Sequence, residues 1–468
     1  MSDRLSPRDV SFLYIEETNT PMHVGGVAVF RPPATGFDYD RLANLVRQRI
    51  VLVPRYRQKI RRVPGGLAKP VWVDDAGFDL SYHVRRSALP RPGTDQQLGE
   101  LVGRLMSRRL DQNRPLWELY LVEGLSRGRF AIVTKTHHAM VDGADAVDLT
   151  QVIFDSSRDP RAVPADGWRP QPEPNAVELV FDAVSDLIRR PSELADTARV
   201  AMLDARATLG KVAGAAGGLL AVARTAARPA PDSPLNAEIG EHRRFGMAST
   251  DLDDYKRIRK AHGGSINDAV LTTIAGALRA WLLNRGEPVT GKTVVRAMVP
   301  LSVRGSADGD DYEAGAPGNK VSSYLVDLPV GEASPVIRLH QVSYAMRAHK
   351  EAGQSVGADA LVQLGGFAPP TLHALGAKTA SGLSRRLFNL VVTNVPGPQY
   401  PLFAASAQML EVFPVVPLAR GQAVAIGVTS YDGGVYYGLN ADRDAMPDIR
   451  VLATLIEESL AELMETIP

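Results

Sequence analysis

A proline-rich segment between Asp159 and Pro174 does most to constrain how this chain can fold. Its five prolines, at positions 160, 164, 170, 172 and 174, each fix φ and remove a backbone hydrogen-bond donor. The segment therefore excludes regular helix or strand and indicates that a domain ends before it. A second proline-containing connector runs from Arg228 to Pro234 and precedes the next folded block.

The length of the chain agrees with a division into domains. At 468 residues it exceeds the size for which one hydrophobic core is usual. Between the two connectors a helical pattern returns, because Asn175 can cap a helix with Glu178 three residues later and apolar residues follow at helical spacing. We expect a first domain at residues 1–165, a Pro-rich and helical connector at 166–239, and a second domain at 240–468.

Short strand-like runs alternate with helical runs in both halves, which is typical of an α/β sandwich. Strands are predicted at Val24–Phe30, Val71–Asp74, Arg129–Thr136, Val294–Val299, Ser322–Leu328, Asn389–Thr393 and Ala423–Thr429. Helices are predicted at Tyr39–Val53, Asp95–Arg109, Asp142–Phe154, Ile266–Leu283 and Ile449–Glu465. The glycine-rich signatures of dinucleotide-binding and P-loop folds are absent, so those chemistries have no support.

Charge and cysteine content exclude several functional classes. With 53 basic and 52 acidic residues the formal charge is +1, which provides no global field toward nucleic acid. The absence of cysteine excludes disulfides, thiolate catalysis and an acyl-cysteine intermediate. The N-terminus, Met1-Ser2-Asp3-Arg4, leads into polar sequence, so we expect no secretory signal and a cytoplasmic protein.

The longest run suited to membrane contact extends from Val212 to Ala223. It falls short of the roughly 20 apolar residues that a spanning helix needs, so we do not expect it to cross a bilayer. Because Lys211 and Arg224 flank it, the run has the charges to rest on a lipid surface. The alternative is a Gly/Ala-rich connector packed on the protein.

Two adjacent histidines, His137 and His138, follow the strand predicted at residues 129–136. Because side chains alternate along a strand, we expect the two imidazoles to face opposite ways, only one of them toward a substrate. An unperturbed imidazole titrates at about pH 6.5 and can act as a general base at neutral pH. Asp142 is placed to fix the following turn, and Gly143 lets substrate or backbone approach closely.

Two other interpretations of the histidine pair are open on the sequence alone. A histidine beside a strand is often simply packed or solvent-exposed, and a pair of histidines can also ligate a metal. A metal site is disfavoured because no third histidine or carboxylate follows at a spacing such as HExxH. We therefore expect neither a metal nor a cofactor.

The segment His137-His138-Ala139-Met140-Val141-Asp142-Gly143 resembles the active-site motif of CoA-dependent acyltransferases, which include chloramphenicol acetyltransferase and the condensation domains of peptide synthetases. Further segments resemble, in order, the bacterial wax ester synthase/diacylglycerol acyltransferase family over essentially the whole chain. They are Leu5-Ser6-Pro7-Arg8-Asp9-Val10-Ser11-Phe12-Leu13, Pro21-Met22-His23-Val24-Gly25-Gly26, Arg114-Pro115-Leu116-Trp117-Glu118, Ile266-Asn267-Asp268, Val299-Pro300-Leu301-Ser302-Val303-Arg304, Gly318-Asn319-Lys320-Val321-Ser322 and Thr393-Asn394-Val395-Pro396-Gly397-Pro398. At Lys320 the family more often has Gln, and residues 160–240 match poorly.

The resemblance implies two chloramphenicol acetyltransferase-like α/β sandwich domains with an active-site tunnel between them. It implies an O-acyltransferase that moves a long-chain acyl group from the co-substrate acyl-CoA to diacylglycerol or a long-chain alcohol, without a covalent acyl-enzyme. His138 would be the general base, with His137 and Asp142 beside it in the catalytic motif and Gly143 against the substrate. A peripheral position on a membrane or lipid droplet would fit such substrates.

Residues of the second half complete the site that the resemblance implies. Asn267 would donate to the oxyanion, although Ser265 or Asn267 could instead simply cap the following helix. Thr393 and Asn394 would line the substrate channel, although pure turn chemistry also explains them. Basic residues available for the CoA phosphates are Arg296, Arg304, Lys320 and Arg420.

Two alternatives to this function follow from the same features. One is a carrier-protein-dependent acyltransferase of the polyketide-associated or condensation type, which the additional family motifs disfavour. The other is a non-catalytic lipid-droplet-binding protein, which would need the apolar run but not the histidine pair. Acceptor preference, acyl length and oligomeric state are not determined by the sequence.

Overall fold

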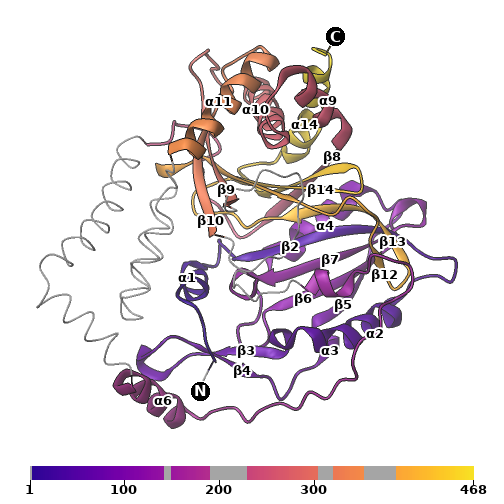
Figure 1. Cartoon of the computed structure of the whole chain (residues 1–468), viewed down its shortest axis with the longest axis vertical. Coiled ribbons are helices and arrows are strands. Elements are labelled where there is room, and N and C mark those ends of the chain that lie inside the picture. The colour runs from indigo at the N-terminus through magenta and orange to yellow at the C-terminus, as the bar shows by residue number, and fades with distance from the viewer. Residues whose placement is uncertain (1–2, 142–148, 190–228, 304–319, 353–385, 468) are drawn as a thin grey trace, which may run out of the picture.

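The structure is a computed structural model of the chain, shown in Figure 1. It describes residues 3–141, 149–189, 229–303, 320–352 and 386–467. Two six-stranded sheets and one three-stranded sheet form the framework, with helices packed on the large sheets. The chain is thus a mixed α/β protein, as its alternating pattern predicts.

The first large sheet carries the histidine motif. Its strand order is β12 (Phe403–Ala404), β13 (Ala407–Val415), β2 (His23–Arg31), β7 (Phe130–His137), β6 (Trp117–Glu123) and β5 (Val84–Ala88). Neighbours are antiparallel except the β5–β6 pair. The helices α2 (Tyr39–Arg49), α3 (Leu80–His83) and α4 (Asp95–Ser107) pack around it, and α1 (Pro7–Ile15) lies against the turn after β7. The first core cluster fills the space between these elements.

The second large sheet has the order β10 (Lys320–Leu328), β9 (Val295–Val303), β11 (Leu390–Pro396), β14 (Val424–Tyr431), β15 (Gly434–Asp442) and β8 (Arg243–Asp251). Figure 1 shows α9 (Leu252–His262), α10 (Ile266–Asn284), α11 (Pro335–Ala352) and α14 (Ile449–Met464) gathered on one side of it. α10 is central, because it packs more extensively against each of the other three than they pack against one another. Its fully buried side chains, such as Trp281 and Leu278, dominate the second core.

A small third sheet holds the connector in place. It joins β1 (Asp3–Arg4), β4 (Val71–Asp74) and β3 (Gln58–Arg61), and Leu179 of α6 (Ala176–Arg189) packs on it. The proline-rich segment has neither helix nor strand between residues 156 and 174, as predicted. Ion pairs nevertheless fix it to the sheet region, because Arg57 binds Asp166 and Lys59 binds Glu173. The predicted cap of α6 is confirmed by reciprocal bonds between Asn175 and Glu178.

The second half of the chain also builds part of the first sheet. β13 pairs with β2 from Val415↔Gly25 to Gln408↔Arg31, so residues 403–415 lie in the first sheet although they follow residue 240. The contact between sheets is close, because a Cβ added to Gly438 would stand 1.8 Å from the carbonyl oxygen of Pro414. The expected boundaries 1–165, 166–239 and 240–468 stay a prediction. The β12–β13 hairpin comes from the expected second domain but lies in the first large sheet.

Most predicted elements occur close to their expected bounds. The seven predicted strands correspond to β2, β4, β7, β9, β10, β11 and β14. The helix predicted at Tyr39–Val53 is shorter, because α2 ends at Arg49 and the 3-10 turns η1 (Ile50–Leu52) and η2 (Pro54–Arg57) follow. Of the helix predicted at Asp142–Phe154, the structure describes α5 (Leu149–Ile153), and residues 142–148 lie outside the described residues.

Within the described ranges, no helix combines the length and apolar character needed to span a bilayer. The run from Val212 to Ala223 lies outside those ranges. Both interpretations of this run, a connector packed on the protein and a segment resting on a lipid surface, therefore stay predictions.

Candidate active site

His137 ends β7 directly opposite His23 of β2. Its side chain is buried, and its Nδ1 accepts a hydrogen bond from the backbone N–H of Ala139 at 3.1 Å. An imidazole that accepts at Nδ1 carries its proton on Nε2 and is neutral. Burial lowers the pKa of His137 from 6.5 to about 4, so the ring is neutral at pH 7. In this state it holds the backbone of the turn that contains the next histidine.

Glu16 places a carboxylate beside His137. It directly follows α1, and its side chain is only 2% exposed. Oε2 accepts hydrogen bonds from Arg109 at 3.1 Å and Gln112 at 2.9 Å, and Oε1 accepts from the backbone N–H of Met22 at 3.3 Å. Oε1 also lies 3.8 Å from Nε2 of His137. The arginine therefore balances the buried negative charge, and the hydrogen bonds offset its lost hydration.

His138 starts a 3-10 turn, η5 (His138–Met140), immediately after β7. Its backbone N–H donates to the carbonyl of Met22 at 2.8 Å. Its ring stacks on Phe12 of α1, with 4.0 Å between centroids and 17° between planes. His138 is partly exposed as a residue, whereas His137 is buried. The two imidazoles thus have separate surroundings, one in the Glu16 cluster and the other on Phe12.

The remaining residues of the histidine motif, Asp142 and Gly143, lie outside the described residues. Their predicted roles in fixing the turn and admitting substrate stay predictions. Sequence reasoning missed Glu16 and Arg109, and it gave Phe12 no role in the site. One signal was available: Phe12 and Glu16 are four residues apart at the end of α1, which places them on the same face of the helix. Their contact with histidines far along the chain carried no local signal.

Two predicted asparagines of the second half meet. Asn394 on β11 donates from Nδ2 to Oδ1 of Asn267 at 3.0 Å. The cap of α10 is Ser265, because its hydroxyl accepts from the N–H of Asp268 and that carboxylate accepts from the N–H of Ser265. Asn267 is therefore not needed as a cap, and with its Oδ1 engaged it keeps Nδ2 as a donor. Thr393 precedes Asn394 on β11 and is half-buried.

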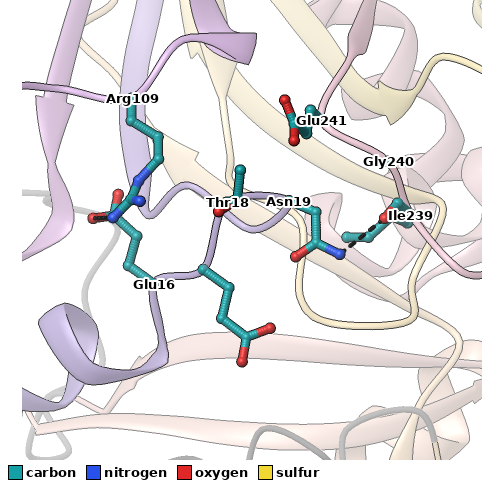
Figure 2. Close-up of a pocket in the computed structure, with 8 residues that line it drawn as sticks. Glu16, Thr18, Asn19, Arg109, Ile239, Gly240 and Glu241 are labelled. Carbon is teal, nitrogen blue, oxygen red and sulfur yellow. Dashed lines mark hydrogen bonds and ion pairs between the residues drawn. The ribbon is translucent and has the colours of Figure 1, made fainter.

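A pocket of about 720 Å³ opens between Glu16, Asn19, Arg109 and the segment 239–241. Figure 2 shows Arg109 against Glu16 on one side and, on the other, Asn19 bonded to the backbone of that segment. Glu16 thus borders both this pocket and the histidine cluster, whereas the described lining does not include His138. The tunnel at His138 stays a prediction, since residues 142–148, 304–319 and 353–385 lie outside the described residues.

The basic residues considered for CoA phosphates are engaged where the structure describes them. Arg296 donates from Nε to Asp327 at 2.7 Å. Arg420 is more than half exposed and lies 3.7 Å from the carboxylate of Glu17. Arg304 and the side chain of Lys320 lie outside the described residues. Within the described part of the chain, no group of three or more histidine or carboxylate side chains is arranged to hold a metal ion.

Two family models match this chain. The model of the wax ester synthase/diacylglycerol acyltransferase catalytic domain matches residues 5–270, and the model of the family's C-terminal domain matches residues 317–464. The chain belongs to the wax ester synthase/diacylglycerol acyltransferase family. The membership predicted from the motifs is therefore confirmed, and the protein is an acyltransferase.

Two relatives from Mycobacterium tuberculosis support this membership in the wax ester synthase/diacylglycerol acyltransferase family. The probable diacylglycerol O-acyltransferase tgs3 is 46% identical over 260 residues, which cover 55% of this chain and 96% of the relative. The probable diacylglycerol O-acyltransferase tgs2 is 34% identical over 479 residues, covering 99% of both chains. The second relative is therefore similar from end to end.

Solved structures support the fold class. The wax ester synthase/diacylglycerol acyltransferase from Marinobacter aquaeolei VT8 has a TM-score of 0.68 and 28% identity, covering 98% of both chains. The first condensation domain of the calcium-dependent antibiotic synthetase has a TM-score of 0.58 at 17% identity, covering 99% of this chain and 96% of that one, and shows a shared fold only. The prediction of two chloramphenicol acetyltransferase-like α/β domains is confirmed.

Proposed function

We propose that this protein transfers a long-chain acyl group from acyl-CoA to diacylglycerol, and to long-chain alcohols as second acceptors, with His138 as the general base. The names of the two mycobacterial relatives support diacylglycerol as the acceptor. Both lipid acceptors partition into bilayers, so we place the enzyme at a membrane or lipid-droplet surface.

The observation that carries the proposal is the difference between the two histidines. His137 is buried, its Nδ1 is used by the turn, and its pKa of about 4 leaves it a poor proton acceptor at pH 7. His138 is partly exposed and held from one face by Phe12. Stacking fixes the plane of its ring. Of the pair, His138 is the histidine suited to take a proton from an alcohol.

The reaction balances without a covalent enzyme intermediate. The acceptor hydroxyl gives its proton to the imidazole of His138, and its oxygen attacks the thioester carbonyl carbon. The carbon–sulfur bond of the tetrahedral intermediate then breaks, and the imidazolium returns the proton to the departing thiolate. The products are an ester and free CoA. The chain contains no cysteine that could carry the acyl group as a thioester.

We assign oxyanion stabilisation to Asn267. The hydrogen bond from Asn394 to its Oδ1 orients the amide and keeps Nδ2 for donation to a developing negative charge. This role follows the family resemblance and the pairing of the two amides. Asp142 and Gly143 keep their predicted parts in the turn beyond His138.

Release of free CoA from palmitoyl-CoA tests the proposal. Ellman's reagent reports the thiol without background from the protein, because the chain has no cysteine. His138→Ala should release thiol at least about a hundredfold more slowly while keeping the wild-type circular dichroism spectrum. The matched control is His340→Ala, since His340 is an exposed histidine on α11 and should leave the rate unchanged.

Product analysis completes the test. With dioleoylglycerol and hexadecanol in one mixture, radiolabelled palmitoyl-CoA should yield labelled triacylglycerol, with wax ester as a second product. Labelled free fatty acid alone would mean that water is the acceptor and would overturn the transfer reaction. Undiminished thiol release by His138→Ala would overturn the assignment of the base.

A further inference from the structure

Glu16 is a buried carboxylate with no assigned part in the reaction. It follows the last turn of α1, and its backbone N–H donates to the carbonyl of Phe12, the residue whose ring stacks on His138. Burying a charge costs several kcal/mol unless hydrogen bonds and an opposite charge offset the lost hydration. A carboxylate buried in such a place is therefore expected to accept hydrogen bonds from specific donors.

The hydrogen-bond partners of Glu16 are all donors. Arg109 and Gln112 bind Oε2, and the backbone N–H of Met22 binds Oε1. Nε2 of His137, which carries the ring proton, lies 3.8 Å from Oε1. Nε2 of His23 lies 3.6 Å from the same oxygen. The three hydrogen-bond donors are matched by a group that only accepts, as an ionised carboxylate does. A glutamine amide would turn its NH2 group toward donors whichever way it is oriented.

Met22 links this carboxylate to His138. Its N–H donates to Glu16, and its carbonyl accepts the backbone N–H of His138 at 2.8 Å. Met22 is itself buried, at 7% exposed, so neither polar group has water as a ready replacement partner. Displacement of the Met22 N–H would shift the strand that supports the catalytic turn.

Nearby contacts brace the other side of the carboxylate. Lys135 on β7 is fully buried and donates to the carbonyls of Leu105 and Arg108 at the end of α4. This fixes the segment that begins with Arg109, and Leu110 in the same segment donates its backbone N–H to Nε2 of His23 at 3.4 Å. Glu16 thus joins α1, β2 and the end of α4 around the histidine turn.

We propose that Glu16 is a positioning residue for His138, holding its backbone through Met22 and its ring plane through the last turn of α1. The inference rests on the proposed function, because it assigns Glu16 a part in the work of His138. Glu16 does not exchange a proton with substrate. Its loss lowers the rate by letting the imidazole depart from the geometry of attack.

A double-mutant cycle separates positioning from general stability. Glu16→Gln should lower kcat about tenfold to a hundredfold, since misplacement by about 1 Å has effects of that size, and KM for palmitoyl-CoA should change less than about twofold. In the His138→Ala background the same substitution should change kcat less than about threefold, because the imidazole it positions is gone. Radiolabelled palmitoyl-CoA gives the sensitivity that this background needs.

Two further variants make the cycle decisive. Glu17→Gln is the matched control, because the neighbouring carboxylate is 36% exposed and pairs only loosely with Arg420, so kcat should stay at the wild-type value. Glu16→Asp keeps an acceptor-only group and should recover part of the lost kcat. If Glu16→Gln does not fold, the cycle is run with Glu16→Asp, whose smaller loss should likewise disappear with His138→Ala.

Each outcome has one meaning. An equal factor from Glu16→Gln with and without His138 would overturn positioning, because the carboxylate would then act independently of the imidazole. Unchanged kcat in Glu16→Gln would overturn it as well. Failure of the proposed function would give a different result: the single variant His138→Ala would keep the wild-type kcat.

Discussion

Replacing His137 with asparagine should make the folded protein less sensitive to acid. Asn Oδ1 stands where Nδ1 of the imidazole stands, so the variant keeps an acceptor for the backbone N–H of Ala139. Unlike histidine, asparagine has no proton to gain as the pH falls. The substitution therefore removes one titration while retaining the bond that shapes the catalytic turn.

The magnitude follows from the pKa of His137 in the two states. It is about 4 in the folded protein, because burial disfavours the imidazolium, and about 6.5 in the unfolded chain. Between these values the unfolded chain binds a proton that the folded protein does not bind. The stabilising contribution is thus complete above pH 6.5 and is lost as the pH falls toward 4. About 1.5 pH units at about 1.4 kcal/mol each give a loss of about 2 kcal/mol by pH 5.

Urea denaturation followed by circular dichroism measures this difference. Between pH 7.5 and pH 5 the free energy of unfolding should fall by about 2 kcal/mol more for the wild type than for His137→Asn. The smaller side chain leaves a cavity that lowers stability at every pH, so the slope is the relevant quantity. His340→Asn, at an exposed position, should follow the wild-type curve. Parallel curves for wild type and His137→Asn would refute a buried neutral histidine.

Gly25→Ala should destabilise the first domain by about 2–3 kcal/mol, because its Cβ would stand 2.0 Å from the carbonyl oxygen of Thr134. A Cβ added to Gly26 would have no atom nearer than 3.8 Å, so Gly26→Ala should lower the free energy of unfolding by less than about 1 kcal/mol. Equal melting temperatures for the two variants would contradict the β2–β7 register. Asn267→Ala should lower kcat about a hundredfold with little change in melting temperature. Ser265→Ala should lower the free energy of unfolding by about 1 kcal/mol, because α10 loses its N-cap, and should leave kcat nearly unchanged. If Ser265→Ala lowered kcat as much as Asn267→Ala does, the separate roles of the two residues would be refuted.

Elements with strong local signals were predicted closely. β4 occupies Val71–Asp74 as expected, and α10 begins at Ile266 behind the capping box of Ser265. Such signals act over three or four residues and need no partner. The strand β13 was not predicted, and its partner β2 lies in the other half of the chain. β6 and β15 were not predicted either, although their partners β7 and β14 adjoin them in sequence. The hydrophobic pattern of a strand does not indicate which distant segment it pairs with.

The candidate site divides in the same way. The histidine motif and the asparagine motifs are contiguous in sequence, so their resemblance to the family's motifs sufficed to propose His138 and Asn267. The contact between Asn267 and Asn394 required α10 and β11 to pack together. Glu16 was missed because a glutamate after a helix is ordinarily a solvated residue, and its 2% exposure arises from the packing of three elements.

The sequence by itself determined the alternation of strands and helices, the proline-rich connector, the family and the histidine motif, because each depends on residue type at short spacing. Only the tertiary structure decided which histidine is buried and neutral, which carboxylate stands beside it, and that the β12–β13 hairpin completes the first sheet. Burial, desolvation and hydrogen bonding depend on neighbours brought together from distant parts of the chain. Those neighbours exist only once the sheets have formed and packed.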